Sequence, residues 1–179
     1  MKQALPIQAR LLDLWESPAM DDRYGECISI RDHMLQCAEL ARAQKMAPPL
    51  IAAALLHDIG WAMPGLLPHE EVAADWLELL FGPEVSEPVR WHVAAKRYLV
   101  AKNHDYLKLL SEESIRTLFS QGGPMNPAEC SQFERNDYFK AAIALRHVDD
   151  AAKELRAPAT SIGDYRELLK TLSAKLASY

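Results

Sequence analysis

A histidine and an aspartate adjoin in the most apolar stretch of the chain. His57 and Asp58 stand in the segment LIAAALLHDIGWAM (residues 50–63), which is apolar on nearly all sides. An ionised carboxylate that is buried without a partner costs several kcal/mol. Asp58 therefore needs a cation or a metal ion beside it, which gives this dipeptide more weight than the many His-Asp pairs that occur by chance.

More metal-type side chains fall on the apolar faces of predicted helices. His33 shares a helix face with Cys37 and Leu40, because residues four and seven apart lie on one side of a helix. One such histidine alone is more often a hydrogen-bonded core residue. Neutral imidazoles and carboxylates together are suited to divalent iron, manganese or zinc, so the whole inward-facing set predicts a metal centre: His33, His57, Asp58, His69, His92 and Asp149. His104 and His147 do not share the pattern, and we expect them to be structural.

Two basic side chains lie on the same helix faces as candidate ligands. Lys96 follows His92 by one helical turn, and Arg146 precedes Asp149 by three residues. A lysine on an apolar stripe often extends to water. The alternative is an ammonium group directed into the metal pocket, which together with Arg146 would suit a small phosphate-like or carboxylate substrate.

The elements that must position these residues are helices. Apolar residues recur every three or four positions through most of the chain, and the alternation typical of a strand is absent. The clearest stripe runs over 69–80, with Pro68 before it and Glu70 and Glu71 in its first turn. Gly and Pro breaks separate the segments. The pattern predicts an all-α fold, a single domain over residues 1–179 built as a bundle of about eight helices.

Two details of this bundle bear on the site. Residues 50–63 are expected to form one central buried helix with the His-Asp pair at its middle. Asp149 is expected on the helix that follows the break at 122–124.

Composition narrows the class of protein. The 179 residues are 49% hydrophobic and 25% charged, which is enough to build a core. There are 20 Lys and Arg against 25 Asp and Glu, a net charge of −5 that argues against nucleic acid as a partner. No apolar run approaches the ~20 residues of a membrane span, and residues 1–24 lack the apolar centre of a signal peptide. Cys27, Cys37 and Cys130 fit free thiols better than a disulfide framework. We expect a cytoplasmic protein and leave its oligomeric state open.

The histidine and aspartate positions resemble the H…HD…D signature of the HD-domain superfamily, carried here by His33, His57-Asp58 and Asp149. Three downstream stretches are similar to the phosphonate-cleaving oxygenase branch of that superfamily, the PhnZ type, which is related to myo-inositol oxygenase. The stretches are HVAAKRYL (92–99), LSEESIRTLFSQGGPM (110–125) and LRHVDDAAK (145–153). The resemblance covers residues 21–155.

The resemblance implies a mixed-valence pair of irons, Fe²⁺ and Fe³⁺, with dioxygen as co-substrate. It implies as ligands His33, His57, Asp58, His69, His92 and Asp149, with Asp58 bridging the metals. The phosphonate contacts of the branch correspond to Lys96, Ser114 and Arg146, and Gln121 belongs to the same stretch. The branch reaction takes hydrogen from the carbon that bears hydroxyl and phosphonate, then cleaves the C–P bond to give phosphate and a carboxylic acid. The expected partner is therefore a small organophosphonate.

One departure from the branch lies beside the His-Asp pair. The branch often has a histidine where this chain has Trp61, four residues after His57. Trp61 is still expected to face the pocket rim. The exchange removes a polar contact to the substrate, which leaves the substituent on the substrate open.

A second departure lies in the Tyr-x-Gly-Glu lid segment of the branch. Here the segment is Tyr24-Gly25-Glu26, one residue shorter. Glu26 keeps its distance to His33, whereas Tyr24 is displaced by one position. Both are carried over as candidate catalytic residues that cover the metal before substrate binds, the alternative being a loop tyrosine and a solvated glutamate.

Two other classes of function compete with the oxygenase. A metal-dependent phosphohydrolase, the commonest activity of HD proteins, would use a metal-bound water to attack a small phosphoester. A non-catalytic HD module that binds a metabolite is disfavoured by the six ligand positions. His69 and His92 do not separate oxygenase from hydrolase, because some HD hydrolases hold two metals. The stretches that follow His92 favour the oxygenase.

Overall fold

The computed structural model describes residues 7–176, and every regular element in that range is a helix. The nine α-helices are α1 (Ile7–Trp15), α2 (Ile30–Ala43), α3 (Pro48–Leu56), α4 (His69–Phe81), α5 (Pro83–Lys102), α6 (Glu112–Ser120), α7 (Pro127–Phe133), α8 (Phe139–Ala151) and α9 (Arg166–Leu176). Four short 3₁₀ helices join them: η1 (Pro18–Asp21), η2 (Ile59–Ala62), η3 (His104–Leu109) and η4 (Ile162–Tyr165). The predicted all-α class is confirmed.

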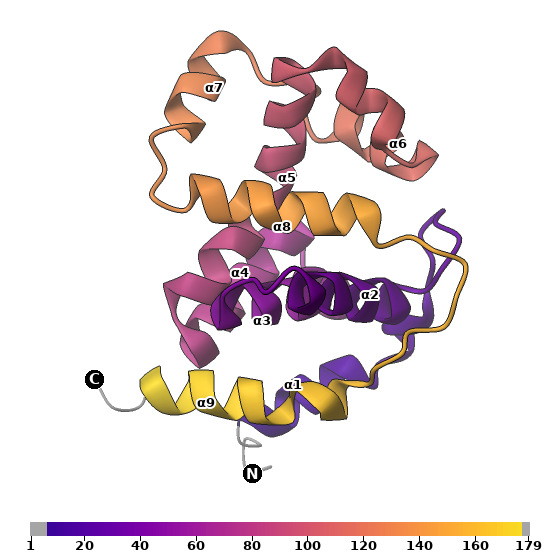
Figure 1. The fold of residues 1–179 in the computed structure, drawn as a ribbon, viewed down its shortest axis with the longest axis vertical. Coiled ribbons are helices and arrows are strands. Elements are labelled where there is room, and N and C mark those ends of the chain that lie inside the picture. The colour runs from indigo at the N-terminus through magenta and orange to yellow at the C-terminus, as the bar shows by residue number, and fades with distance from the viewer. Residues whose placement is uncertain (1–6, 177–179) are drawn as a thin grey trace.

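The long helix α5 organises the bundle by packing against α4, α8 and α3. Helices α2 and α3 pack on each other and on α8, which crosses the middle of the molecule in Figure 1. Helices α6 and α7 lie at one end of the long axis, and α1 and α9 lie at the other. The main core fills the space between these layers with fully buried residues such as Met34, Leu55, Leu56, Leu77 and Leu145.

Side-chain caps set where the helices that carry the site begin. The Ser29 hydroxyl accepts a hydrogen bond from the backbone N–H of Asp32 at the start of α2. Ser111 caps α6 in the same way through Ser114. Each cap sets the residue at which its helix begins. Between residues 7 and 176, no helix is both long and apolar enough for a bilayer crossing.

The expectation of one continuous helix over residues 50–63 is wrong. Helix α3 ends at Leu56, and η2 begins at Ile59 after a turn in which Asp58 has φ −101° and ψ 8°. Neighbouring residues of a continuous helix point about 100° apart, so an unbroken helix would direct His57 and Asp58 to different surroundings. The break lets both side chains face one centre.

The expected position of Asp149 also needs correction. The helix that follows the break at 122–124 is the short α7, and Asp149 lies on the next helix, α8. Helix α7 begins at a capping box between Asn126 and Glu129, which are polar residues that an apolar-stripe search passes over.

Candidate metal centre and substrate pocket

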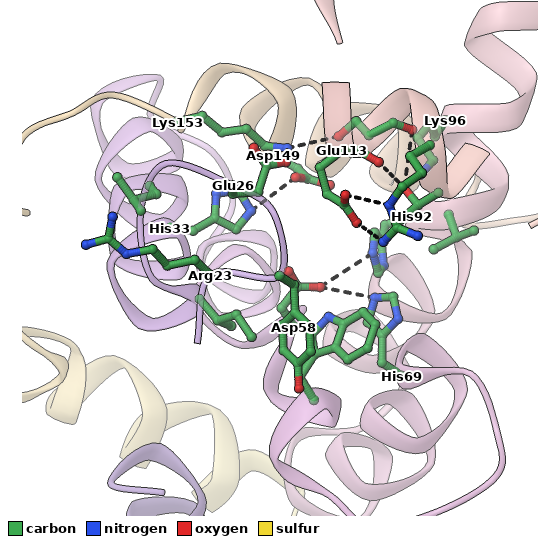
Figure 2. A pocket seen from close by; sticks show the side chains of 18 of the residues that line it. Arg23, Glu26, His33, Asp58, His69, His92, Lys96, Glu113, Asp149 and Lys153 are labelled. Atoms are coloured by element: carbon green, nitrogen blue, oxygen red, sulfur yellow. Dashed lines mark hydrogen bonds and ion pairs between the residues drawn. The ribbon is translucent and has the colours of Figure 1, made fainter. Parts of the chain in front are cut away.

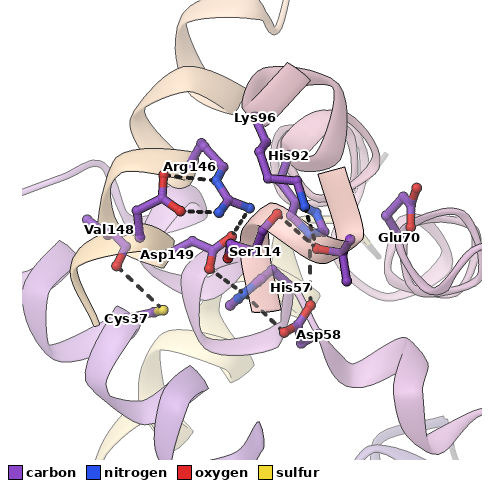
Figure 3. Close-up of polar contacts among 12 residues, drawn as sticks. Cys37, His57, Asp58, Glu70, His92, Lys96, Ser114, Arg146, Val148 and Asp149 are labelled. Carbon is purple, nitrogen blue, oxygen red and sulfur yellow. Dashed lines mark hydrogen bonds and ion pairs between the residues drawn. The ribbon is translucent and has the colours of Figure 1, made fainter. Parts of the chain in front are cut away.

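Five segments bring the six candidate ligands to one centre (Figures 2 and 3). Asp58 Oδ1 lies 3.1 Å from His69 Nε2 and 3.8 Å from His92 Nε2, and Asp58 Oδ2 lies 3.5 Å from His57 Nε2. Asp149 Oδ1 lies 3.1 Å from His33 Nε2 and 3.9 Å from His57 Nε2. Asp58 therefore lies between His57 on one side and His69 and His92 on the other, the arrangement expected of a carboxylate shared by two metal ions.

Backbone carbonyls orient three of the four clustered imidazole rings through the Nδ1 atom. Three of them have Nδ1 within hydrogen-bond distance of a backbone carbonyl: His33 at 2.8 Å from Ala152, His57 at 3.0 Å from Ala54 and His92 at 2.7 Å from Val89. A neutral ring that donates from Nδ1 presents a bare lone pair at Nε2. In all three rings Nε2 is the atom that faces the two carboxylates.

The environment suits a divalent metal. His57 is fully buried, and its Nε2 has no hydrogen-bond partner in the described part of the chain. Such an enclosed and unsatisfied nitrogen is costly unless something binds it. Imidazole nitrogens together with carboxylate oxygens are a donor set for iron, manganese or zinc. The six residues therefore fit the metal pair that the fold family implies.

The charges at the centre follow from burial and from one another. Burial opposes ionisation of Asp58, but His57, His69 and His92 outweigh it and hold the pKa of Asp58 below its usual range. Burial lowers the pKa of His92 to about 3, helped by the neighbouring rings, and lowers the pKa of His57 as well. At neutral pH, His57 and His92 are neutral and Asp58 is ionised, which is the form that binds metal. Against the effect of burial, Asp149 beside His33 and Asp58 beside His69 raise the pKa of those two rings, so each would release a proton on binding metal.

Cys37 lies beside His33 without extending the ligand set. Its Sγ is 3.9 Å from Nδ1 and 3.8 Å from Nε2 of His33, so the sulfur packs on the ring and not at one nitrogen. It also donates to the carbonyl of Val148 at 3.7 Å, and burial raises the pKa of the thiol. Cys37 is thus a protonated packing residue.

A cationic pocket opens next to the candidate metal ligands (Figure 2). Lys96 is only 3% exposed, and its Nζ donates to the hydroxyl of Thr117 at 2.8 Å. The alternative of a lysine that extends to water is therefore excluded. Burial, and then the charge of Arg146, lower the pKa of Lys96 to about 8. Arg146 is equally buried and pairs with Asp149 at 2.7 Å and with Asp150.

A third cation, Lys153, joins this pocket and was not predicted. Its Nζ donates to Ser114 at 2.9 Å, to Ser111 at 3.1 Å, and to Glu26. Glu26 is therefore tied into the pocket wall and is not a solvated surface residue. Lys153 lies two residues beyond the end of α8, so helical spacing from Arg146 does not identify it.

The pocket rim carries the two positions that depart from the branch. Trp61 stacks on His69 with ring centroids 4.4 Å apart, and Tyr24 stacks on the other side of Trp61 at 4.7 Å. Tyr24 has φ 40°, a left-handed conformation that a tyrosine rarely adopts. Gln121 also lines the pocket, with a buried Oε1 that has no hydrogen-bond partner in residues 7–176.

The two histidines expected to be structural lie away from this centre. His104 begins η3 and is exposed, and the exposed His147 ring packs edge-on against Tyr106 at 6.1 Å. Several polar residues of the pocket were not predicted as site residues: Arg23, Glu113, Arg116, Thr117 and Lys153. Thr117 follows Ser114 by three residues, so the helical spacing could have identified it.

Comparison with known proteins adds an independent finding. The HD domain family matches residues 30–116. A glycine-betaine-forming dioxygenase of 1-hydroxy-2-(trimethylamino)ethylphosphonate from Leisingera caerulea is 42% identical over 144 residues, which cover 74% of each chain. A hydroxymethylphosphonate dioxygenase from Gimesia maris is 40% identical over 73% of this chain and 70% of its own. An uncharacterized protein of Acanthamoeba polyphaga mimivirus is 33% identical over 94% of this chain and 83% of its own.

Proposed function

Because this chain belongs to the HD-domain superfamily, in the branch of the hydroxyphosphonate dioxygenases, we propose that it cleaves the C–P bond of a small 1-hydroxyphosphonate with dioxygen. The products are inorganic phosphate and a carboxylic acid. One dioxygen per substrate balances the reaction, because the two oxygen atoms complete the carboxylate and the phosphate. The observation that carries the proposal is the cationic pocket of Lys96, Arg146 and Lys153 beside the six-residue cluster.

The six clustered residues would hold two iron ions, with Asp58 shared between them. An Fe²⁺/Fe³⁺ pair supplies the redox chemistry that reduction of dioxygen requires. His33, His57 and Asp149 form one half of the cluster, and His69 and His92 form the other.

The protein binds and orients the substrate through its own cations and hydroxyls. Lys96 and Arg146 neutralise the phosphonate, and the hydroxyl of Ser114, which accepts from Lys153, donates its own proton to a phosphonate oxygen. The hydroxyl of Thr117 accepts from Lys96 and holds the ammonium group in place. Lys96 shares a helix face with His92, so an anion at its ammonium group lies next to the metal ligands. This arrangement holds the C–H bond of the substrate at the cluster, which contributes orientation to the rate.

The proposal extends to the remaining properties of the chain. We treat residues 1–179 as one domain that acts in the cytoplasm on an organophosphonate, without nucleic acid or membrane as partner. Trp61 and Tyr24 stand at the rim, where the substituent of the substrate would lie.

The test is anaerobic loading with ferrous iron, followed by dioxygen and a small panel of 1-hydroxyphosphonates. Oxygen uptake and phosphate release are followed together, and we expect one dioxygen per phosphate and no turnover under argon. His92→Ala should lose metal and activity, whereas the exposed His147→Ala is the matched control. Phosphate released equally well under argon would make the protein a metal-dependent phosphohydrolase. Substrate binding without any product would make it a metabolite-binding module.

A further inference from the structure

We infer that Glu70 is a positioning residue that orients His69 toward the metals and strengthens its ring as a ligand. The inference rests on the metal pair of the proposed function. His69 differs from the other three clustered histidines, whose Nδ1 atoms face backbone carbonyls. The Nδ1 atom of His69 instead faces a carboxylate oxygen, Glu70 Oε2, at 3.1 Å. The same ring directs Nε2 to Asp58, also at 3.1 Å.

The burial of Glu70 points to a specific partner. Glu70 is the second residue of α4 and its side chain is only 12% exposed, whereas the side chain of the next residue, Glu71, is 45% exposed and pairs with Arg90. An acidic residue in the first turn of a helix interacts favourably with the helix dipole. An exposed side chain gains this interaction and keeps its hydration, whereas a buried one loses its hydration. Helix stabilisation alone therefore accounts for Glu71 and not for the enclosed carboxylate of Glu70.

The partner of that carboxylate is His69. Glu70 Oε2 is enclosed, and no aligned hydrogen bond reaches it from the described residues. Its contact with Nδ1 of His69 is close but not aligned as a hydrogen bond. Hydrogen bonds at catalytic sites often tighten only once the ligand is present, so we expect this pair to align when metal binds Nε2 of His69.

The ring of His69 has little freedom to turn away from Glu70. Trp61 covers its face at 4.4 Å with the planes 15° apart. The backbone of His69 passes so close to Gly60 that a Cβ there would lie 2.1 Å from the His69 carbonyl oxygen. With its face and its backbone held, the ring keeps one edge on Glu70 and the other on Asp58.

A carboxylate behind a metal-binding histidine is a stronger support than a carbonyl. It fixes the tautomer, orients the ring and increases electron donation to the metal, and its loss typically weakens metal binding 10–100-fold. The structure therefore assigns unequal support to the two halves of the cluster. In the half that contains Asp58, His69 and His92, the ring of His69 is supported by the carboxylate of Glu70.

The test is a Co²⁺ titration of the metal-free protein, followed by visible absorption and by equilibrium dialysis. Wild-type protein should take up two ions in two steps. Glu70→Gln should weaken one step by about 10–100-fold and leave the other step unchanged. Glu71→Gln is the matched control, because it removes the same charge from the same helix turn without touching His69, and it should bind as wild type.

A second variant, Glu70→Asp, keeps the charge at the helix start but withdraws the carboxylate from Nδ1. Glu70→Asp should weaken the same metal-binding step. If circular dichroism shows that Glu70→Gln does not fold, Glu70→Asp still tests the inference. Wild-type affinity in both Glu70 variants, or equal weakening of both steps together with a lowered melting temperature, would overturn the inference. A wild-type chain that takes up only one ion contradicts the proposed metal pair, yet selective weakening of that step by Glu70→Gln still supports the role of Glu70.

Discussion

Lys96 combines deep burial with a positive charge that the proposed phosphonate substrate would need. Because burial and Arg146 lower its pKa to about 8, the ammonium form of the free protein is present below pH 8 and is lost as the pH rises through that value. A dianionic phosphonate binds the ammonium form. We therefore expect kcat/KM, which reports the free enzyme, to fall above about pH 8.

Replacing the side chain tests the same point. A charge-assisted hydrogen bond is worth about 1.5–3 kcal/mol, so Lys96→Ala should lower kcat/KM by roughly 10–100-fold and abolish the fall above pH 8. Metal content should not change. The exposed Lys108 provides the control variant, Lys108→Ala. A Lys96→Ala enzyme that keeps the wild-type pH profile would refute the anion pocket.

At the residue scale, much of the candidate site could be predicted, because its members sit on helices with a clear apolar stripe. His92 and Lys96 share one face of α5, and the structure finds both buried and inward. Lys153 escaped prediction because α8 ends at Ala151 and helical spacing has no meaning beyond a helix end. Glu70 escaped because acidic residues in a first turn are ordinary.

At the scale of elements, formation of the site depends on close packing between η2, which follows α3, and the start of α4. Helix α4 starts where the backbone of His69 crosses η2 at Gly60, and there is no space for a methyl group between them. Gly60→Ala should therefore push α4 away from η2 and separate His69 from Asp58. We expect a loss of stability of about 3 kcal/mol or more, beyond the usual cost of overpacking because the clash is with backbone, together with a loss of metal.

Urea unfolding and metal analysis check this expectation. Gly65→Ala is the matched control, since a Cβ at Gly65 meets its nearest atoms only at 3.9 and 4.0 Å, ordinary contact distances. Gly60→Ala protein with wild-type stability and two bound metals would show that η2 and α4 can separate without damage to the centre.

The elements themselves were largely predictable, because three- and four-residue spacing is strong in α4 and α5. The exceptions have physical reasons. Residues 50–63 are apolar on all sides, so no stripe marks the point at which α3 stops. Helix α7 is seven residues long and is defined by its capping box, so periodicity has too few residues to detect it.

At the scale of the whole molecule, the centre joins elements that are far apart in sequence. Its candidate ligands come from α2, the end of α3, α4, α5 and α8, which together enclose the main core. Metal that binds only the folded chain stabilises it by mass action, by about 2.7 kcal/mol for one ion at a hundred times its Kd. Removal of metal should therefore lower the melting temperature by roughly 5–10 °C for a chain of this size.

Thermal unfolding with and without a chelator measures this effect. Adding Fe²⁺ or Co²⁺ back should restore the melting temperature in a concentration-dependent way in wild-type protein, and should not do so in His92→Ala. An unchanged melting temperature after verified metal removal would mean that the five segments are held together by the apolar core alone.

The carbonyl groups behind His33, His57 and His92 have a consequence for how this site can vary in evolution. A carbonyl belongs to the main chain, so no point mutation can delete it, and the orientation of three rings is buffered against changes at Ala152, Ala54 and Val89. The acceptor behind His69 is a side chain, so one base change in a single codon can remove it. If Glu70 has the proposed role, inherited substitutions at position 70 would change the metal site more directly than substitutions behind the other three rings, and could adapt it to a different metal supply or redox environment.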